Sequence, residues 1–225
     1  MKIDKIAFFG YIVLCVVAII ANSFELYGIK LVSKSLLIPV LFFYYIGNVS
    51  KISVLPCLYF FFNFLGDSIG VFEFEDEVVY LIVPFFLCNI TLILIMLKKL
   101  ERLKFSFINI LSIVIISAFL GYLWWSIVDV FSYRVDDLQY KVGIYGAFLF
   151  LISFLASYII IHRMNLSNLF LLLCVICILI SDVFYVVYNF QANIPIFDSI
   201  LFSCQVFSYL FFVKFIILGE KQNAV

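Results

Sequence analysis

The sequence has few charged residues. Asp, Glu, Lys and Arg make up only 12% of its 225 residues, whereas hydrophobic residues make up 67%. A soluble domain averages about a quarter charged and about half apolar residues. So few charges cannot cover a soluble surface, and we expect an integral membrane protein. The formal net charge is zero, so the basic face that nucleic-acid binding requires is not indicated, and we expect no nucleic-acid partner.

The sequence is also poor in the residues of common catalytic and metal sites. It has a single histidine, His162, which falls in a basic connection between apolar runs, and it has no glycine-rich phosphate loop. A Ser–His–Asp triad or a histidine-ligated metal is therefore not expected. The six cysteines all lie inside apolar runs. They do not form the loop framework of a disulfide-rich domain, and we interpret them, including the pair Cys174 and Cys177, as small apolar residues.

Long apolar runs fill most of the chain. A membrane-spanning helix needs roughly 20 apolar residues, and only helices satisfy the backbone of such runs in lipid. We therefore predict an all-α, polytopic bundle of eight transmembrane helices, forming a single transmembrane domain over residues 1–225, with the first helix also acting as an uncleaved signal. The predicted spans are 6–22, 31–47, 52–71, 78–97, 105–128, 140–161, 167–188 and 197–219.

The connections between these runs alternate in charge. The segment 73–77 is acidic, 98–104 is basic, 129–137 is net acidic and 162–165 is basic. Lys and Arg favour the cytoplasmic side of a membrane, so this alternation fits eight crossings. It predicts a multi-pass protein of the cytoplasmic (inner) membrane with both termini in the cytoplasm.

Three charged residues interrupt the apolar runs at matching depths. Lys34, Asp67 and Asp182 all fall near the predicted outer ends of their helices. A charge in a membrane costs free energy and persists where it is paired, faces a cavity or has a function. One interpretation is a structural Lys–Asp pair that fixes helix register. The other is a functional site.

Polar neighbours share the helix faces of the two aspartates. Asn63 lies one turn before Asp67, while Tyr185 and Asn189 follow Asp182 at i+3 and i+7. Residues at such spacings lie on one helix stripe. These residues could hydrate a cavity, which favours the functional interpretation.

Five segments in order suggest a family. They read KLVSKSLLIPVLFFYY, FLGDSIGVF, KVGIYGAFLF, LISDVFYVVYNF and FSCQVFSYLFFVKFIILGE. The chain resembles the YhhN family, which includes lysoplasmalogenases, from about residue 30 to 220. The most telling motifs are the Gly–Asp and Ser–Asp pairs, together with the lysine of the second run and the Gln-x-x-x-Tyr near the end.

The resemblance implies a membrane hydrolase whose substrate is a lysophospholipid, held among membrane lipids. The reaction would hydrolyse the vinyl ether bond of a lysoplasmalogen to a fatty aldehyde and a glycerophospho head group, without a metal or organic cofactor. Asp67 and Asp182 would act together, one as a protonated acid and the other as a carboxylate that stabilises the cation or activates water. Which aspartate has which role is open.

The remaining candidates would bind the substrate or orient water. Lys34 could bind the phosphate or hold one aspartate ionised. For the uncharged polar candidates, a structural role in hydrogen bonds between helices is at least as good an interpretation as substrate binding. The substrate-binding set comprises Lys34, Asn63, Tyr145, Tyr185, Asn189 and Gln205.

Two departures from the family pattern keep other functions open. Lys34 is followed by Ser35 rather than proline, and the fourth run carries Asn89 where the family often has His or Gln followed by Tyr. One alternative is a non-catalytic protein of the same fold. Another is a small-solute or proton-coupled transporter, because intramembrane charges also mark ion pathways and the two aspartates are four spans apart, as in a parallel repeat. The oligomeric state is open.

Overall fold

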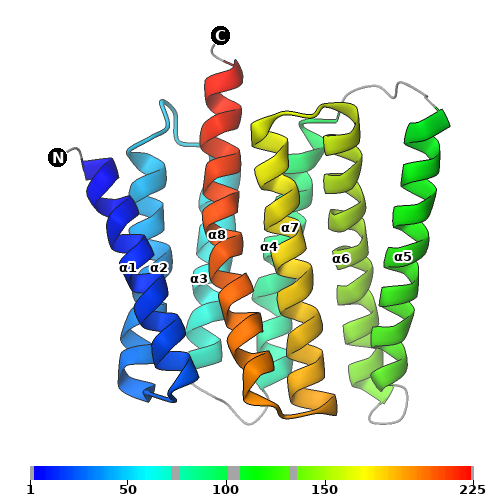
Figure 1. Cartoon of the computed structure of the whole chain (residues 1–225), viewed down its shortest axis with the longest axis horizontal. Coiled ribbons are helices and arrows are strands. Elements are labelled where there is room, and N and C mark those ends of the chain that lie inside the picture. The colour runs from blue at the N-terminus through cyan, green and yellow to red at the C-terminus, as the bar shows by residue number, and fades with distance from the viewer. Residues whose placement is uncertain (1–2, 72–76, 101–106, 132–135, 224–225) are drawn as a thin grey trace.

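The computed structural model of the chain is an all-helical bundle (Figure 1). It describes residues 3–71, 77–100, 107–131 and 136–223. Within these residues eight α-helices and one π-helical turn follow one another, and no strand occurs. The helices are α1 (Ile3–Ser23), α2 (Tyr27–Ile46), α3 (Val54–Val71), α4 (Glu77–Leu97), α5 (Phe107–Phe131), α6 (Asp136–His162), α7 (Leu166–Val186) and α8 (Pro195–Asn223), and the π turn η1 (Val187–Gln191) follows α7.

Seven of these helices are long and apolar enough to cross a membrane, and the protein is therefore an integral, multi-pass membrane protein. The exception is α3, which has 18 residues. At 1.5 Å per residue a helix of this length extends about 27 Å, close to the hydrocarbon thickness of a bilayer. It is the shortest of the eight α-helices that the structure describes, and it lies inside the bundle beside its neighbours (Figure 1).

Several helices extend beyond the predicted apolar runs. The second helix begins at Tyr27 instead of residue 31, the sixth begins at Asp136 instead of residue 140, and the last ends at Asn223 instead of residue 219. Polar residues at the ends of these helices continue the backbone hydrogen bonding after the apolar run has ended. The acidic and basic connections at 73–77 and 98–104 lie mostly outside the described residues.

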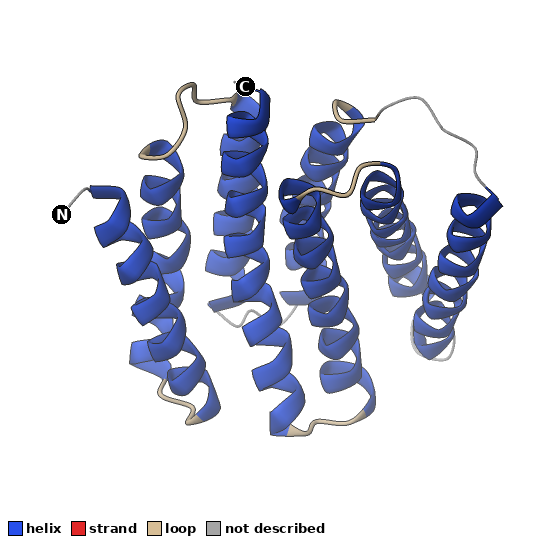
Figure 2. Ribbon diagram, turned by 45° about the horizontal axis from the view of Figure 1, so that its top comes forward, coloured by secondary structure: helices blue, strands red, loops and turns tan. Residues whose placement is uncertain are grey.

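Successive helices run in opposite directions, so both ends of the chain lie at the same end of the bundle (Figures 1 and 2). We call this the terminal end and the other the distal end. The connections α1–α2 and η1–α8 lie at the distal end. Helix α8 occupies the middle of the bundle and packs against α1, α2 and α7.

Aromatic side chains fill the core where α3 meets α8. The rings of Tyr59 and Phe212 stack with their centroids 3.7 Å apart, and both side chains are buried. Phe60 meets Phe212 edge-on at 5.8 Å. Such ring pairs contribute about 0.5–1.5 kcal/mol beyond their buried area. They fix α3 against α8 and so determine which residues of the two helices face each other further towards the distal end.

Candidate functional site

A cavity of about 490 Å³ lies between the helices. It reaches from Tyr59 and Cys88, inside the bundle, to Asn189 and Asp198 near the distal end. Pockets of this volume are typical of small-molecule sites. All eight residues singled out from the sequence line it: Lys34, Asn63, Asp67, Tyr145, Asp182, Tyr185, Asn189 and Gln205.

Asp67, on α3, is surrounded by hydrogen-bond donors. Its side chain is only 3% exposed. Gln205 Nε2 donates to Oδ1 at 2.7 Å, and the Tyr209 hydroxyl lies 3.0 Å from Oδ1 and 2.9 Å from Oδ2. Both donors come from α8, one turn apart. This arrangement suits a carboxylate, which accepts hydrogen bonds at both oxygens.

Lys34 supplies the matching positive charge from α2. Its Nζ lies 4.0 Å from Asp67 Oδ1, and the same nitrogen lies 5.6 Å from the centre of the Phe202 ring. Lys30 precedes it by one turn and also lines the cavity. Two lysines on one face of α2 therefore lead from the distal end towards Asp67.

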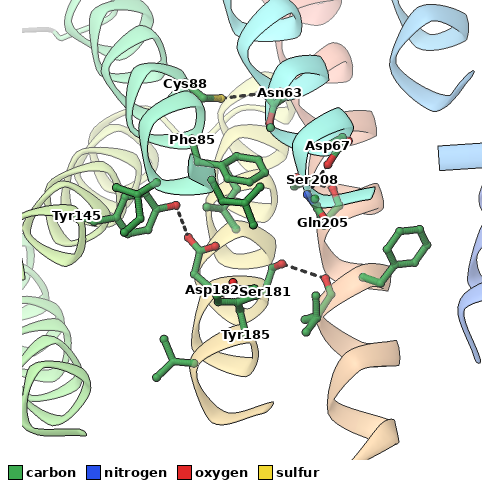
Figure 3. Close-up of a pocket in the computed structure, with 18 of the residues that line it drawn as sticks. Asn63, Asp67, Phe85, Cys88, Tyr145, Ser181, Asp182, Tyr185, Gln205 and Ser208 are labelled. Atoms are coloured by element: carbon green, nitrogen blue, oxygen red, sulfur yellow. Dashed lines mark hydrogen bonds between the residues drawn. The ribbon is translucent and has the colours of Figure 1, made fainter. Parts of the chain in front are cut away.

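Asp182, on α7, has a different environment. Its side chain is half-buried, and the hydroxyl of Tyr145 donates to Oδ2 at 3.0 Å (Figure 3). Among the described residues this carboxyl therefore has one side-chain donor, from α6, whereas Asp67 has two donors and a cation. The neighbouring Ser181 donates to the backbone oxygen of Leu201 at 3.0 Å and joins α7 to α8 beside the site.

Phe85 of α4 stands between the two aspartate groups in the view of Figure 3. Its ring packs on Gly66, where a Cβ would lie 2.8 Å from Phe85 Cζ. Only glycine gives the ring this close approach to α3. In the Gly–Asp motif, Asp67 supplies a carboxylate to the cavity and Gly66 leaves room for the Phe85 ring in the cavity wall.

The other predicted polar residues lie at the two extremes of the cavity. At the inner end Asn63 donates its amide to Tyr59 O and to Cys88 Sγ, each at 2.8 Å. At the distal end Asn189 lies exposed in the π turn and donates to Tyr185 O at 2.9 Å. Such π-helical turns are frequent at functional sites.

Tyr209 and Asn89 belong to the site but were not among the site residues predicted from the sequence. Tyr209 contacts Asp67 directly, and its position four residues after Gln205 could have indicated this because the two share one helix face. Asn89 is buried in the cavity wall, and its Nδ2 has no hydrogen-bond partner in the described part of the chain. The sequence gives no signal that this donor is available for a ligand.

The arrangement brings two carboxyl groups and a lysine to one partly apolar cavity. The carboxyls sit on different helices and differ in their neighbours, which is the condition for them to hold different protonation states. Such a pair can deliver a proton to a substrate and stabilise a developing positive charge. In the described residues no group of three or more His, Cys, Asp or Glu side chains is placed to hold a metal ion.

Comparison with models of known protein families, with characterised proteins and with solved structures finds no match.

Proposed function

We propose that the protein is a membrane hydrolase that cleaves the vinyl ether bond of lysoplasmalogens. The observation that carries this proposal is the cavity lined by Asp67, Asp182 and Lys34, with different surroundings for the two carboxyls. The resemblance of the five motifs to the YhhN family supports the same reaction.

The surroundings favour distinct roles for the two aspartates. Asp67 receives hydrogen bonds from Gln205 and Tyr209 and lies beside Lys34, so we assign it the ionised role. Asp182 has Tyr145 as its donor and faces the cavity, so we assign it the role of the acid.

The proposed reaction begins when Asp182 transfers its proton to the vinyl carbon that is not bonded to oxygen. This gives an oxocarbenium ion, which the Asp67 carboxylate stabilises. Water adds to the cationic carbon and releases a proton to the Asp182 carboxylate. The neutral hemiacetal then collapses, and its hydroxyl proton is transferred through a carboxyl group to the departing glycerol oxygen. The products are a fatty aldehyde and a glycerophospho alcohol, so one water is consumed and the acid is regenerated.

Binding of the substrate would use the lysines on α2. Lys34 is engaged with Asp67, whereas Lys30 lies one turn closer to the distal end. We therefore assign the substrate phosphate to Lys30, with the hydrocarbon chain along the aromatic and aliphatic wall that includes Phe85.

The charge distribution supports an orientation in the membrane. The described basic residues of the terminal end include Lys51, Lys98, Lys99, Arg163 and Lys221. By the positive-inside rule we propose that this end is cytoplasmic and that the protein lies in the cytoplasmic membrane. The cavity then opens towards the outer leaflet.

The experiment is an aldehyde assay on purified protein in detergent, run in D₂O. We expect fatty aldehyde from a lysoplasmalogen, with one deuterium on the carbon next to the carbonyl, because the acid delivers a solvent-derived hydron to that carbon. The product is reduced at once to the alcohol to prevent exchange of this label. The ester analogue is the control and is expected to stay intact, because ester cleavage does not proceed by carbon protonation.

Failure of the purified protein to release aldehyde, across several head groups and chain lengths, would contradict the proposal. That result would favour a transporter or a non-catalytic protein of the same fold.

A further inference from the structure

A second pocket, of about 240 Å³, lies at the terminal end, away from the aspartate cavity. It is bounded by the end of α4, the α6–α7 connection and the end of α8. Its described lining contains Lys98, Lys99, His162 and Arg163 but no Asp or Glu. The described wall of the pocket therefore gathers positively charged side chains from the ends of α4 and α6.

Lys99 is held in a fixed place in this pocket. Its Nζ donates to Ser167 Oγ at 3.2 Å and lies 4.0 Å from the centre of the Phe215 ring. Ser167 donates its own proton to the backbone oxygen of Phe215 at 2.9 Å, so its hydroxyl is free to accept from the lysine. The ammonium is thus anchored by α7 and α8 and does not extend freely into solvent.

Gly219 makes room for this lysine. A Cβ at Gly219 would lie 2.7 Å from Lys99 Nζ and 3.2 Å from Ser167 Oγ. Any larger residue at this position in α8 would displace the Lys99 ammonium from its contacts with Ser167 and Phe215. The cation and the space for it are therefore built into the packing of the helices.

His162 has a buried nitrogen that nothing in the described chain satisfies. Its ring stacks on Tyr158 with the centroids 4.2 Å apart, and its Nδ1 lies 2.9 Å from Tyr158 O. Its Nε2 is buried and has no hydrogen-bond partner among the described residues. A phosphate oxygen accepts a hydrogen bond from this atom when the ring is protonated, and the hydroxyl of a phosphate monoester or of a phosphatidylglycerol head group donates to it when the ring is neutral.

The start of α7 adds a further attraction for an anion. Asn165 caps this helix by accepting the backbone N–H of Asn168 at 2.7 Å, and both residues line the pocket. The amino end of a helix carries a partial positive charge. The Asn168 amide donates to the backbone oxygen of Arg163 at 2.8 Å and fixes the turn that carries the arginine.

The surroundings of Lys99 lower the pKa of its ammonium group. Removal from water and the nearby charge of Arg163 lower the pKa of Lys99 to about 8. An anion placed between these residues would offset both effects.

We propose that this pocket binds a phosphate group at the membrane surface. Lys98 and Lys99 directly follow the last residue of α4, and Arg163 directly follows α6, so the pocket lies at the level of the lipid head groups. The phosphate belongs either to an anionic phospholipid or to a small soluble phosphate ester. The site is separate from the aspartate cavity and does not depend on the proposed hydrolase activity.

The test titrates the full-length protein, in an uncharged detergent, with three probes. These are phosphatidylglycerol in mixed micelles, glycerol 3-phosphate, and phosphatidylcholine as the zwitterionic reference. The thermal unfolding midpoint at each concentration gives an apparent affinity, since a ligand that binds only the folded state raises it. We expect phosphatidylglycerol to raise the midpoint and phosphatidylcholine to leave it unchanged. A matching effect of glycerol 3-phosphate identifies a soluble ester as a ligand, and its absence identifies the lipid.

Two variants locate the binding. Arg163→Gln removes an exposed charge, and Gly219→Ala displaces Lys99 without changing the net charge. Each is expected to weaken the apparent affinity at least fivefold. Lys51→Gln removes an exposed charge from the same end outside the pocket and is the matched control, expected to stay within twofold of the unsubstituted protein.

If Gly219→Ala does not fold, Arg163→Gln and Lys51→Gln decide the question. Unchanged affinity in Arg163→Gln, or a midpoint that none of the anionic probes raises, overturns the proposal.

Discussion

Asp67 illustrates how a carboxylate is accommodated in an apolar bundle. A buried ionised group is tolerated only where hydrogen bonds and an opposite charge replace water. Gln205 and Tyr209 provide these hydrogen bonds and Lys34 provides the charge. The same contacts that make Asp67 structurally acceptable also keep it charged, so at this residue stability and the proposed chemistry depend on the same neighbours.

Tyr209→Phe tests this dependence. The change removes one donor from Asp67 and is expected to lower the rate of aldehyde release by about ten- to a hundredfold, because a hydrogen bond to a charged group contributes about 1.5–3 kcal/mol. The rate is measured with the lysoplasmalogen assay, beside the thermal midpoint.

Tyr11→Phe is the matched control for that variant. The Tyr11 hydroxyl, from α1, donates to the backbone oxygen of Val206 at 2.7 Å, on the helix that carries Tyr209, and not to the Asp67 carboxyl. It should reduce stability without reducing the rate per folded molecule. Equal rates in the two variants would show that the Tyr209 hydroxyl has no special role at Asp67.

At the scale of single helices, the apolar runs predicted the number and order of the helices but not their ends. The eight runs match the eight described helices, because only helices satisfy the backbone in lipid. The start of α2 was misplaced, because Tyr27 and Lys30 continue the helix beyond the apolar residues. The π turn after α7 was not predicted, since nothing in its sequence, VYNFQ, distinguishes it from an α-helical turn.

The contact between α3 and α4 gives a prediction at this scale. Gly66→Ala places a Cβ 2.8 Å from Phe85 Cζ, so the ring must move. We expect the displaced ring to occupy part of the cavity and to raise KM for the lysoplasmalogen severalfold with a smaller effect on kcat. Steady-state kinetics of aldehyde release measure both constants.

Gly121→Ala, in α5, is the control for that change. Among the described residues, no atom outside the local turn of α5 lies within 4 Å of the added Cβ, and Ala favours a helix over Gly. It should leave KM unchanged. A Gly66→Ala protein with the KM of the Gly121→Ala protein would contradict the position given to Phe85.

At the scale of the whole molecule, the sequence predicted how deep the polar residues lie but not which of them meet. Charged residues stand out in an apolar run, so Lys34, Asp67 and Asp182 could be selected directly. The rotation of each helix about its axis is determined by packing, such as the stacking of Tyr59 on Phe212, and no pattern in one sequence reveals it. For this reason the ion pair of Lys34 with Asp67 was only one of two options, and the open amide of Asn89 was missed.

The orientation of the bundle gives a further prediction at this scale. Met164, at the terminal end, is 88% exposed, and Asn193, at the distal end, is also exposed. A cysteine introduced as Asn193→Cys should react with a membrane-impermeant maleimide added to intact cells, whereas Met164→Cys should react only after the membrane is opened. The reverse pattern would invert the orientation while leaving the bundle and its cavity unchanged.

The central claim is that the carboxyls of Asp67 and Asp182 act together in one cavity, and the most direct measurement is aldehyde release by Asp67→Asn and Asp182→Asn. An amide keeps the shape of the side chain but cannot deliver the proton or balance the cation. We expect each variant to fold and to lose at least about a hundredfold in rate, the range that general acid–base catalysis contributes. Asp198→Asn is the control. It changes a carboxyl that accepts a hydrogen bond from Asn22 near the distal end of the same cavity, and it should keep most of the rate of aldehyde release. Rates equal to that of the unsubstituted protein in both Asp67→Asn and Asp182→Asn would contradict the account.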